Sequence, residues 1–155
     1  MSMPSFTAER TLGRLAKWLR IMGFDTVYEG DETRAGAAGT TVGNRVYLTR
    51  TLRIARTPHC RPLLLIRSND LRGQLREVVS ALDIRRSDVC LFSRCLTCNR
   101  SVRVADKTDV RGRVPDYVWA DQEHFSQCPK CLKIFWPGTH ADRTDELIRQ
   151  VFENE

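Results

Sequence analysis

The sequence lacks any hydrophobic run long enough to cross a membrane. Its longest apolar run, Leu63–Ile66, is the length of a buried strand, whereas a membrane helix needs about 20 apolar residues. Residues 1–5 show no basic segment leading into an apolar core, so a secretory signal is not visible. We therefore expect a cytoplasmic protein, in which the cysteines stay reduced.

The sequence also lacks internal repeats and low-complexity segments. Its 155 residues are 41% hydrophobic and 28% charged, a composition that excludes wholesale disorder. The length suits one ordinary domain, or a small domain followed by a module that a metal ion holds together.

Lysine is scarce: 21 of the 25 basic residues are arginine, the side chain best suited to bidentate phosphate contacts. Residues 1–93 hold 15 basic and 9 acidic side chains, and residues 94–155 hold 10 of each, so the whole excess of +6 lies in the first part. Two interpretations stay open at this point. The arginines form an ordinary solvated surface, or they form a face that binds a polyanion such as RNA.

Hydrophobic patterning indicates strands that alternate with helices in the first part of the chain. Strands are expected at 4–8, 24–28, 46–49 and 63–66, and helices at 12–22, 51–56 and 71–82. This alternation predicts an α/β domain with a mainly parallel sheet over residues 1–92. Residues 93–155 differ, with short β-prone pieces beside paired cysteines and a final helix from about Thr144.

Two Cys-x2-Cys pairs are the strongest local signal. They are Cys95 with Cys98 and Cys128 with Cys131, separated by 29 residues. Each pair can place two thiolates on one tetrahedral ion, so together they predict a four-cysteine zinc ribbon, with iron as the lesser option. A four-thiolate site has no open position, so this zinc would be structural. Two disulfides or a redox-active pair are the alternatives.

Two further features of the cysteine pattern remain. Cys60 and Cys90 are left over, and we expect them to be small buried apolar residues. The 29-residue insert is long for a ribbon and is expected to form a hairpin with a surface excursion.

Acidic side chains follow several of the expected strands. Glu9 ends the first strand, Asp70 follows the strand at 63–66, and Asp31 and Glu32 lie in a glycine-rich loop. Groups just beyond the carboxyl ends of parallel strands meet at one crevice, where several carboxylates would hold Mg²⁺ or Mn²⁺ for phosphodiester hydrolysis. The plainer roles are a helix N-cap for Asp70, an exposed turn for Glu9 and loop solubility for the other two.

The sequence resembles the Mut-seven C-terminal RNase domain family, a PIN-like nuclease domain with an appended zinc ribbon. The most specific stretch is Leu12-Gly-Arg-Leu-Ala-Lys-Trp-Leu-Arg20 together with the cysteine pairs. The matching segments, in order along nearly the whole chain, are Phe6–Arg20, Gly23–Thr26, Val46–Arg50, Leu65–Asp70, Phe92–Cys98, Arg113–Pro115, Cys128–Cys131 and Phe135–His140.

The resemblance implies a three-layer PIN-like domain and a metal-dependent endoribonuclease whose catalytic carboxylates correspond here to Glu9, Asp31 or Glu32, and Asp70. The chain departs from the family pattern at two positions. Glu9 stands where the family has aspartate, and Thr51 stands where an aspartate follows Leu-Thr-Arg. A threonine hydroxyl is a weak neutral ligand, so we expect an acidic site with weakened or lost activity.

Candidate RNA contacts are basic residues near the expected site. They are Arg14, Lys17 and Arg20 on the first helix, and Arg50, Arg53 and Arg67 after strand ends. A solvated helix face is an equally good account of the first three, whereas the last three sit better for backbone phosphates. Two function classes follow: a ribonuclease, or a non-catalytic adaptor that binds RNA or protein through the same fold.

Overall fold

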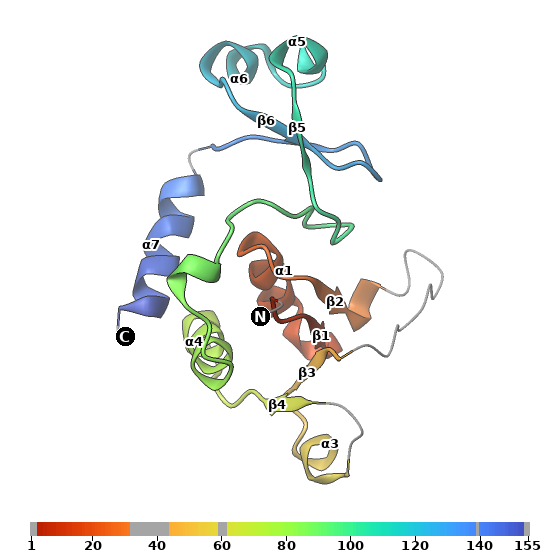
Figure 1. The fold of residues 1–155 in the computed structure, drawn as a ribbon, viewed down its shortest axis with the longest axis vertical. Coiled ribbons are helices and arrows are strands. Elements are labelled where there is room, and N and C mark those ends of the chain that lie inside the picture. The colour runs from red at the N-terminus through yellow and green to blue at the C-terminus, as the bar shows by residue number, and fades with distance from the viewer. Residues whose placement is uncertain (1–2, 32–43, 59–61, 139, 154–155) are drawn as a thin grey trace.

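The computed structural model describes residues 3–31, 44–58, 62–138 and 140–153 (Figure 1). A first domain contains a parallel sheet covered by helices, and a smaller cysteine-bearing ribbon stands at one end of it. Within the described part, none of the helices combines the length and the apolar character needed to cross a bilayer. Glu32 and Cys60, two residues singled out from the sequence, lie outside the described residues.

The first sheet has four parallel strands in the order β2-β1-β3-β4. Their bounds are β1 Phe6–Ala8, β2 Thr26–Tyr28, β3 Val46–Thr49 and β4 Leu63–Leu65. All four run the same way, so the residues that follow them gather at one edge of the sheet. We call this edge the strand-end edge.

The helices of this domain form where the apolar spacing predicted them. The helices are α1 Gly13–Ile21, α3 Leu52–Arg56 and α4 Leu71–Ala81. Three 3-10 turns accompany them: η1 Arg10–Leu12, η2 Glu29–Asp31 and η3 Arg86–Asp88. Gly23 lies just after the end of helix α1, and only glycine readily adopts its φ of 96°. A Cβ there would come within 2.6 Å of the Cys90 carbonyl oxygen, so this close approach also requires glycine.

The ribbon contains a three-stranded antiparallel sheet in the order β5-β6-β7. Its elements are β5 Arg103–Ala105, α5 Lys107–Val110, α6 Asp116–Asp121, β6 Phe125–Gln127 and β7 Ile134–Phe135. The insert between the cysteine pairs therefore holds two short helices, which the sequence interpretation missed. They enclose a second small core of Val110, Val114, Val118 and Phe125.

The final helix, α7 His140–Phe152, returns to the first domain (Figure 1). Ile148 and Val151 join the core of that domain, and the Gln150 carbonyl accepts a hydrogen bond of 2.7 Å from Arg76 of α4. The division at residue 92 stays a prediction, and the last helix packs against the core of the first domain. The expected fold class, an α/β domain with a parallel sheet and an appended four-cysteine ribbon, is confirmed.

Candidate functional site

The four ribbon cysteines lie at the tips of two similar turns, which we call the first knuckle (95–100) and the second knuckle (128–133). In each knuckle the amide of the first cysteine donates to a carbonyl five residues on, from Cys95 to Arg100 at 2.7 Å and from Cys128 to Lys133 at 3.0 Å. In each, the residue four positions after that cysteine has positive φ, 56° at Asn99 and 61° at Leu132. The repeated geometry turns both thiol pairs toward one point.

The sulfurs of Cys95, Cys98, Cys128 and Cys131 all lie within 4.8 Å of one another. The Cys95 and Cys131 sulfurs are 3.7 Å apart. Zn–S bonds of about 2.3 Å in a tetrahedron require sulfurs about 3.8 Å apart, so the donor set fits a metal ion such as zinc. All four are free thiols. Cys90 is exposed and not buried as expected, because it lies in the turn that follows η3.

The thiols of the knuckles ionise unequally in the absence of a cation. Burial and the neighbouring Cys131 raise the pKa of Cys98 to about 12. Burial also opposes ionisation of Cys128, but the amides of Cys131 and Lys130 stabilise its thiolate and lower its pKa to about 7. A divalent cation adds the positive charge that allows all four to ionise together.

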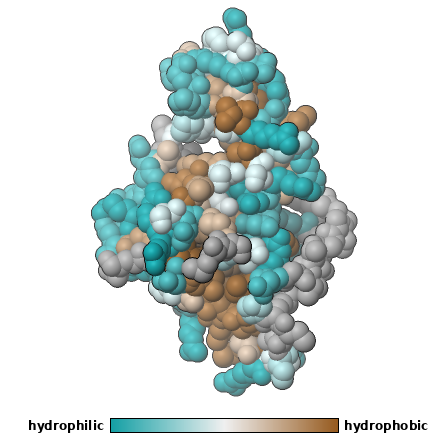
Figure 2. Space-filling model, in the orientation of Figure 1, coloured by the Kyte–Doolittle hydropathy of each residue, from teal (hydrophilic) through white to brown (hydrophobic). Residues whose placement is uncertain are grey.

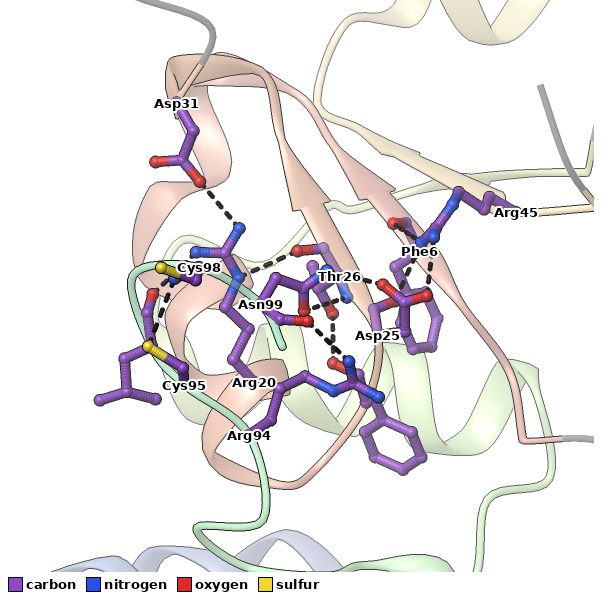
Figure 3. A network of polar contacts seen from close by, with 12 residues as sticks. Phe6, Arg20, Asp25, Thr26, Asp31, Arg45, Arg94, Cys95, Cys98 and Asn99 are labelled. Carbon is purple, nitrogen blue, oxygen red and sulfur yellow. Dashed lines mark hydrogen bonds and ion pairs between the residues drawn. The ribbon is translucent and has the colours of Figure 1, made fainter. Parts of the chain in front are cut away.

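The first knuckle is attached to the first domain through polar contacts (Figure 3). The Asn99 side-chain oxygen accepts the Thr26 amide of β2 at 3.0 Å, and its nitrogen donates to Asp25 at 2.6 Å. Arg94 donates to the carbonyls of Gly23 and Asn99. These contacts join the first knuckle to the edge strand β2.

Arg20 belongs to the same attachment, which corrects its expected role as an RNA contact. Its side chain is 5% exposed. Its guanidinium donates to the Thr26 carbonyl at 2.9 Å, to the Leu96 carbonyl at 2.7 Å and to the Asp31 carboxylate at 2.8 Å (Figure 3). A buried arginine must have partners for its donors, and here they hold α1, β2 and the first knuckle together.

Glu9 occupies the centre of the strand-end edge, directly after β1, and is 9% exposed. Its carboxylate accepts four hydrogen bonds, from the hydroxyls of Thr11, Thr49 and Thr51 and from the Arg50 amide. The contacts from Thr11, Arg50 and Thr51 are each 3.0 Å long. A carboxylate offers about four lone-pair sites, so these donors saturate it.

The donors around Glu9 also set its ionisation. Burial raises the pKa of Glu9, but the hydrogen bonds from Thr49, Arg50, Thr51 and Thr11 outweigh burial and leave the pKa below its ordinary value. The carboxylate is therefore ionised at neutral pH, and the dipoles of these donors stabilise its charge.

Asp70 lies at the same edge, beyond β4, and is exposed. Its carboxylate accepts the Gly73 amide at 3.0 Å and caps α4, and this hydrogen bond holds the pKa of Asp70 below its usual value. Arg50 links this end of β4 to Glu9. Its backbone amide donates to the Glu9 carboxylate, and its guanidinium donates at 2.5 Å to Asn69, the residue before Asp70. Strands β1 and β4 are two strand spacings apart, about 10 Å.

The expected convergence of carboxylates is not present among the residues that the structure describes. In that part of the chain, the four cysteines make up the one group of three or more potential metal ligands. Asp31 pairs with Arg20 at 2.8 Å beside the ribbon instead, and Glu32 is not described. Glu9 and Asp70 thus share an edge, but no described carboxylate completes a metal-ligand group with them.

Two glutamates that the sequence interpretation missed take part in the strand-end edge. Glu29 follows β2 directly and accepts the Tyr47 hydroxyl at 2.8 Å and the Arg10 amide at 3.3 Å. The rule that singled out Glu9, an acid just after a strand, would have found it. Glu77 of α4 accepts the amides of Arg67 and Ser68 at 2.9 and 2.6 Å, and no sequence signal indicates this contact.

The remaining basic candidates are all exposed. Arg50, Arg53 and Arg67 follow β3 and β4 at the strand-end edge, and Arg14 and Lys17 lie on α1. Their positions agree with an anion-binding surface, although exposure by itself assigns no ligand.

The fold and the thiol cluster define the class of this protein as an α/β domain with a four-cysteine ribbon whose donor set fits a metal ion. Within that class, the chain belongs to the Mut7-C RNAse domain family, whose family model matches residues 4–148. This membership indicates a nuclease-like function. We found no match to the chain among curated proteins or among solved structures.

Proposed function

We propose that this protein acts on RNA as a metal-dependent ribonuclease of the PIN-like type whose hydrolytic activity is weak or lost. Family membership supports the ribonuclease class. The saturated hydrogen bonding of Glu9 supports the loss of activity and is the observation on which this proposal rests.

A catalytic Mg²⁺ or Mn²⁺ ion in a nuclease activates water and stabilises the charge on the leaving oxygen. The donor set of this chain fits such an ion poorly. Binding at Glu9 would break hydrogen bonds that already satisfy the carboxylate, and Thr51 adds a neutral hydroxyl in place of a charge. The hard divalent ions need several oxygen ligands with negative charge, and Asp70 alone cannot supply them.

Binding of RNA does not need the metal. The exposed cations Arg50, Arg53 and Arg67 at the strand-end edge and Arg14 and Lys17 on α1 provide phosphate contacts. In this proposal a zinc ion on the four cysteines has a structural role, and the protein works in the reducing cytoplasm, where the thiols remain available to the metal.

The test is cleavage of single-stranded RNA with Mn²⁺, measured for the wild type and for Asp70→Asn. Asparagine caps helices as well as aspartate, so this variant removes the charge and keeps α4 intact. We expect little or no turnover from either protein. Robust cleavage by the wild type that Asp70→Asn abolishes would contradict the proposal of a degenerate site.

A gain-of-function variant sharpens the test. Thr51→Asp places a second carboxylate beside Glu9, where two like charges repel unless a cation binds. We expect Mn²⁺ to raise the melting temperature of Thr51→Asp by a few degrees, and to leave the wild type and the neutral control Thr51→Asn unchanged. Equal Mn²⁺ stabilisation of all three proteins would show that Thr51 does not limit metal binding.

The alternative function is a non-catalytic adaptor that binds RNA or protein, and the saturated state of Glu9 favours it as well. Salt separates the two kinds of partner. Binding of RNA through phosphates weakens steeply as the salt concentration rises, whereas an apolar protein interface changes much less. If the protein does not bind single-stranded RNA even at low salt, both the ribonuclease proposal and the RNA-binding adaptor are overturned.

A further inference from the structure

A cleft of about 400 Å³ opens between the first domain and the ribbon. One wall comes from α1, Tyr28 and Asp31, and the other from the first knuckle and from Lys133 and Phe135. The volume falls within the range of small-ligand sites, about 300–1,000 Å³. Glu9 and Asp70 do not line it, so it is distinct from the strand-end edge around those two carboxylates, although Asp31 belongs to its wall.

The charge of the cleft is positive. Four charged side chains line it: Lys17, Arg20, Lys133 and Asp31, which gives three positive charges and one negative, a net of +2. Arg20 and Asp31 are paired with each other at 2.8 Å. The two lysines remain, one on each wall and both exposed. Lys133 donates to the Thr97 hydroxyl at 3.1 Å, a neutral partner that leaves its charge free to meet an anion.

The cleft also presents two half-buried aromatic rings, Tyr28 and Phe135. The Tyr28 hydroxyl donates to the Arg10 carbonyl at 2.8 Å, which fixes the ring. Gly13 and Gly30 flank this ring; a Cβ at Gly30 would collide with it, and one at Gly13 would come within 2.9 Å of its hydroxyl oxygen. Glycine at both positions therefore makes room for the tyrosine at the cleft.

Aromatic rings and lysines in the lining of one cleft match the chemistry of a nucleotide. A base stacks on an aromatic side chain, and its phosphates pair with cations on either side. Only an unstacked base can enter such a cleft, so a single strand fits and a duplex does not.

We propose that this cleft holds one nucleotide of single-stranded RNA, with the base against Phe135 or Tyr28 and the phosphates between Lys17 and Lys133. This proposal rests on the RNA-directed function and assigns it a binding subsite. Tyr28 ends β2, and Gly13 begins α1 just after η1, which follows Glu9. A strand that leaves the cleft along this side reaches the strand-end edge and its arginines.

The test measures binding of a short fluorescent single-stranded RNA of mixed sequence to the full chain by anisotropy. The double variant Lys17→Glu with Lys133→Glu reverses both cleft lysines. The matched control, Arg86→Glu with Arg103→Glu, makes the same change in net charge at two exposed arginines outside the cleft. We expect the cleft variant to lose affinity about tenfold more than the control, and its salt slope to fall by about 1.4, or 0.7 per phosphate contact.

The base contact needs a separate variant. Phe135→Leu keeps an apolar side chain and removes the aromatic face. We therefore expect this variant to bind RNA about tenfold more weakly than the wild type. Its affinity for inorganic polyphosphate should equal that of the wild type, because polyphosphate has no base to stack. Unchanged melting temperatures and metal content establish that the ribbon is intact in each variant. Should Phe135→Leu lose melting temperature, photocrosslinking of thiouridine-containing RNA to wild-type residues 28 and 135 replaces it.

Three results would overturn the proposal. In the first, the cleft variant and its control lose RNA affinity equally; this leaves the RNA-directed function in place and removes the subsite. In the second, free adenosine monophosphate binds as tightly as the RNA and is displaced by it, which makes the cleft a site for free nucleotides. In the third, crosslinks map away from residues 28 and 135. Failure of the wild type to bind RNA at all would instead contradict the proposed function itself.

Discussion

Glu9 illustrates at the residue scale how neighbours decide what a carboxylate does. With an aspartate at position 51 it would share a site with a second negative charge. With Thr51 it accepts a hydrogen bond from the threonine hydroxyl, and Thr11, Thr49 and the Arg50 amide donate the other three. A hydrogen bond to a charged acceptor contributes about 1.5–3 kcal/mol. The hydrogen bonds to Glu9 therefore hold the end of β1 against the end of β3.

We predict that Glu9→Gln lowers the free energy of unfolding at neutral pH by about 1–3 kcal/mol. The variant should also lose less stability than the wild type as the pH falls into the acid range. The folded pKa of Glu9 lies below its unfolded value. The charged form therefore stabilises the fold above about pH 4.3, and this stability is lost as the pH falls through the lower folded pKa. Urea unfolding of wild type and variant from pH 7 to pH 3 measures the difference.

The exposed acid Asp121 provides the control for charge alone. Asp121→Asn removes one exposed negative charge and should leave the stability at neutral pH unchanged. If Glu9→Gln behaves like Asp121→Asn, the hydrogen-bonded shell around Glu9 has no energetic role.

At the scale of elements, the two knuckles share a backbone and differ in their surroundings. Asn99 and Leu132 occupy equivalent positions with φ near 60°, where a leucine is strained by about 1–2 kcal/mol. Leu132 is 57% exposed. Asn99 instead bridges Asp25 and the Thr26 amide of β2. The same turn position therefore carries an exposed side chain in the second knuckle and a joint to the first domain in the first knuckle.

We predict opposite outcomes for glycine at these two positions. Leu132→Gly relieves the strain and should change stability by no more than about 1 kcal/mol, since the flexibility of glycine offsets part of the gain. Asn99→Gly keeps the backbone conformation but removes both side-chain hydrogen bonds, at a cost of about 1–3 kcal/mol. Chemical unfolding monitored by circular dichroism compares them, and equal effects would refute the role of Asn99 as a joint.

At the scale of the whole molecule, contacts join the first domain to the chain both before and after the ribbon sheet. Arg20, Arg94 and Asn99 attach the first knuckle to α1 and β2. After the ribbon, α7 packs its buried Ile148 and Val151 against the first core. A metal ion bound by the ribbon cysteines would therefore support the first domain as well as the ribbon.

Hydrophilic side chains dominate the outline of the molecule, with apolar patches on the ribbon and around β4 (Figure 2).

We predict that a strong chelator, added under reducing conditions, exposes the Thr26 amide to hydrogen exchange. This amide donates to Asn99 at 3.0 Å, and metal removal unfolds small four-cysteine modules. Protection at Thr26 should fall tenfold or more before that at Tyr47, whose amide donates to Pro62 within the sheet at 2.9 Å. Native mass spectrometry follows the loss of one metal ion per chain. Unchanged exchange at Thr26 after metal loss would contradict the coupling.

Local signals in the sequence predict much of this architecture. The apolar spacing of α1 and α4, the runs at β3 and β4 and the cysteine pairs are visible within short windows, because burial of one face imposes a fixed period. The short helices α5 and α6 escaped this reasoning. They are four and six residues long, too short to show a period, and tertiary packing around Phe125 stabilises them.

By itself, the sequence determined that a parallel sheet precedes a four-cysteine ribbon and that acids and arginines follow the strands, since these properties depend on residue type and spacing. Only the tertiary structure decided what each charge faces. It buried Arg20 against Leu96, 76 residues away, directed Asp31 to that arginine, surrounded Glu9 with threonines, and opened a cleft where α1 meets β7. The partners of a side chain are set by contacts between distant segments, and no local pattern encodes them.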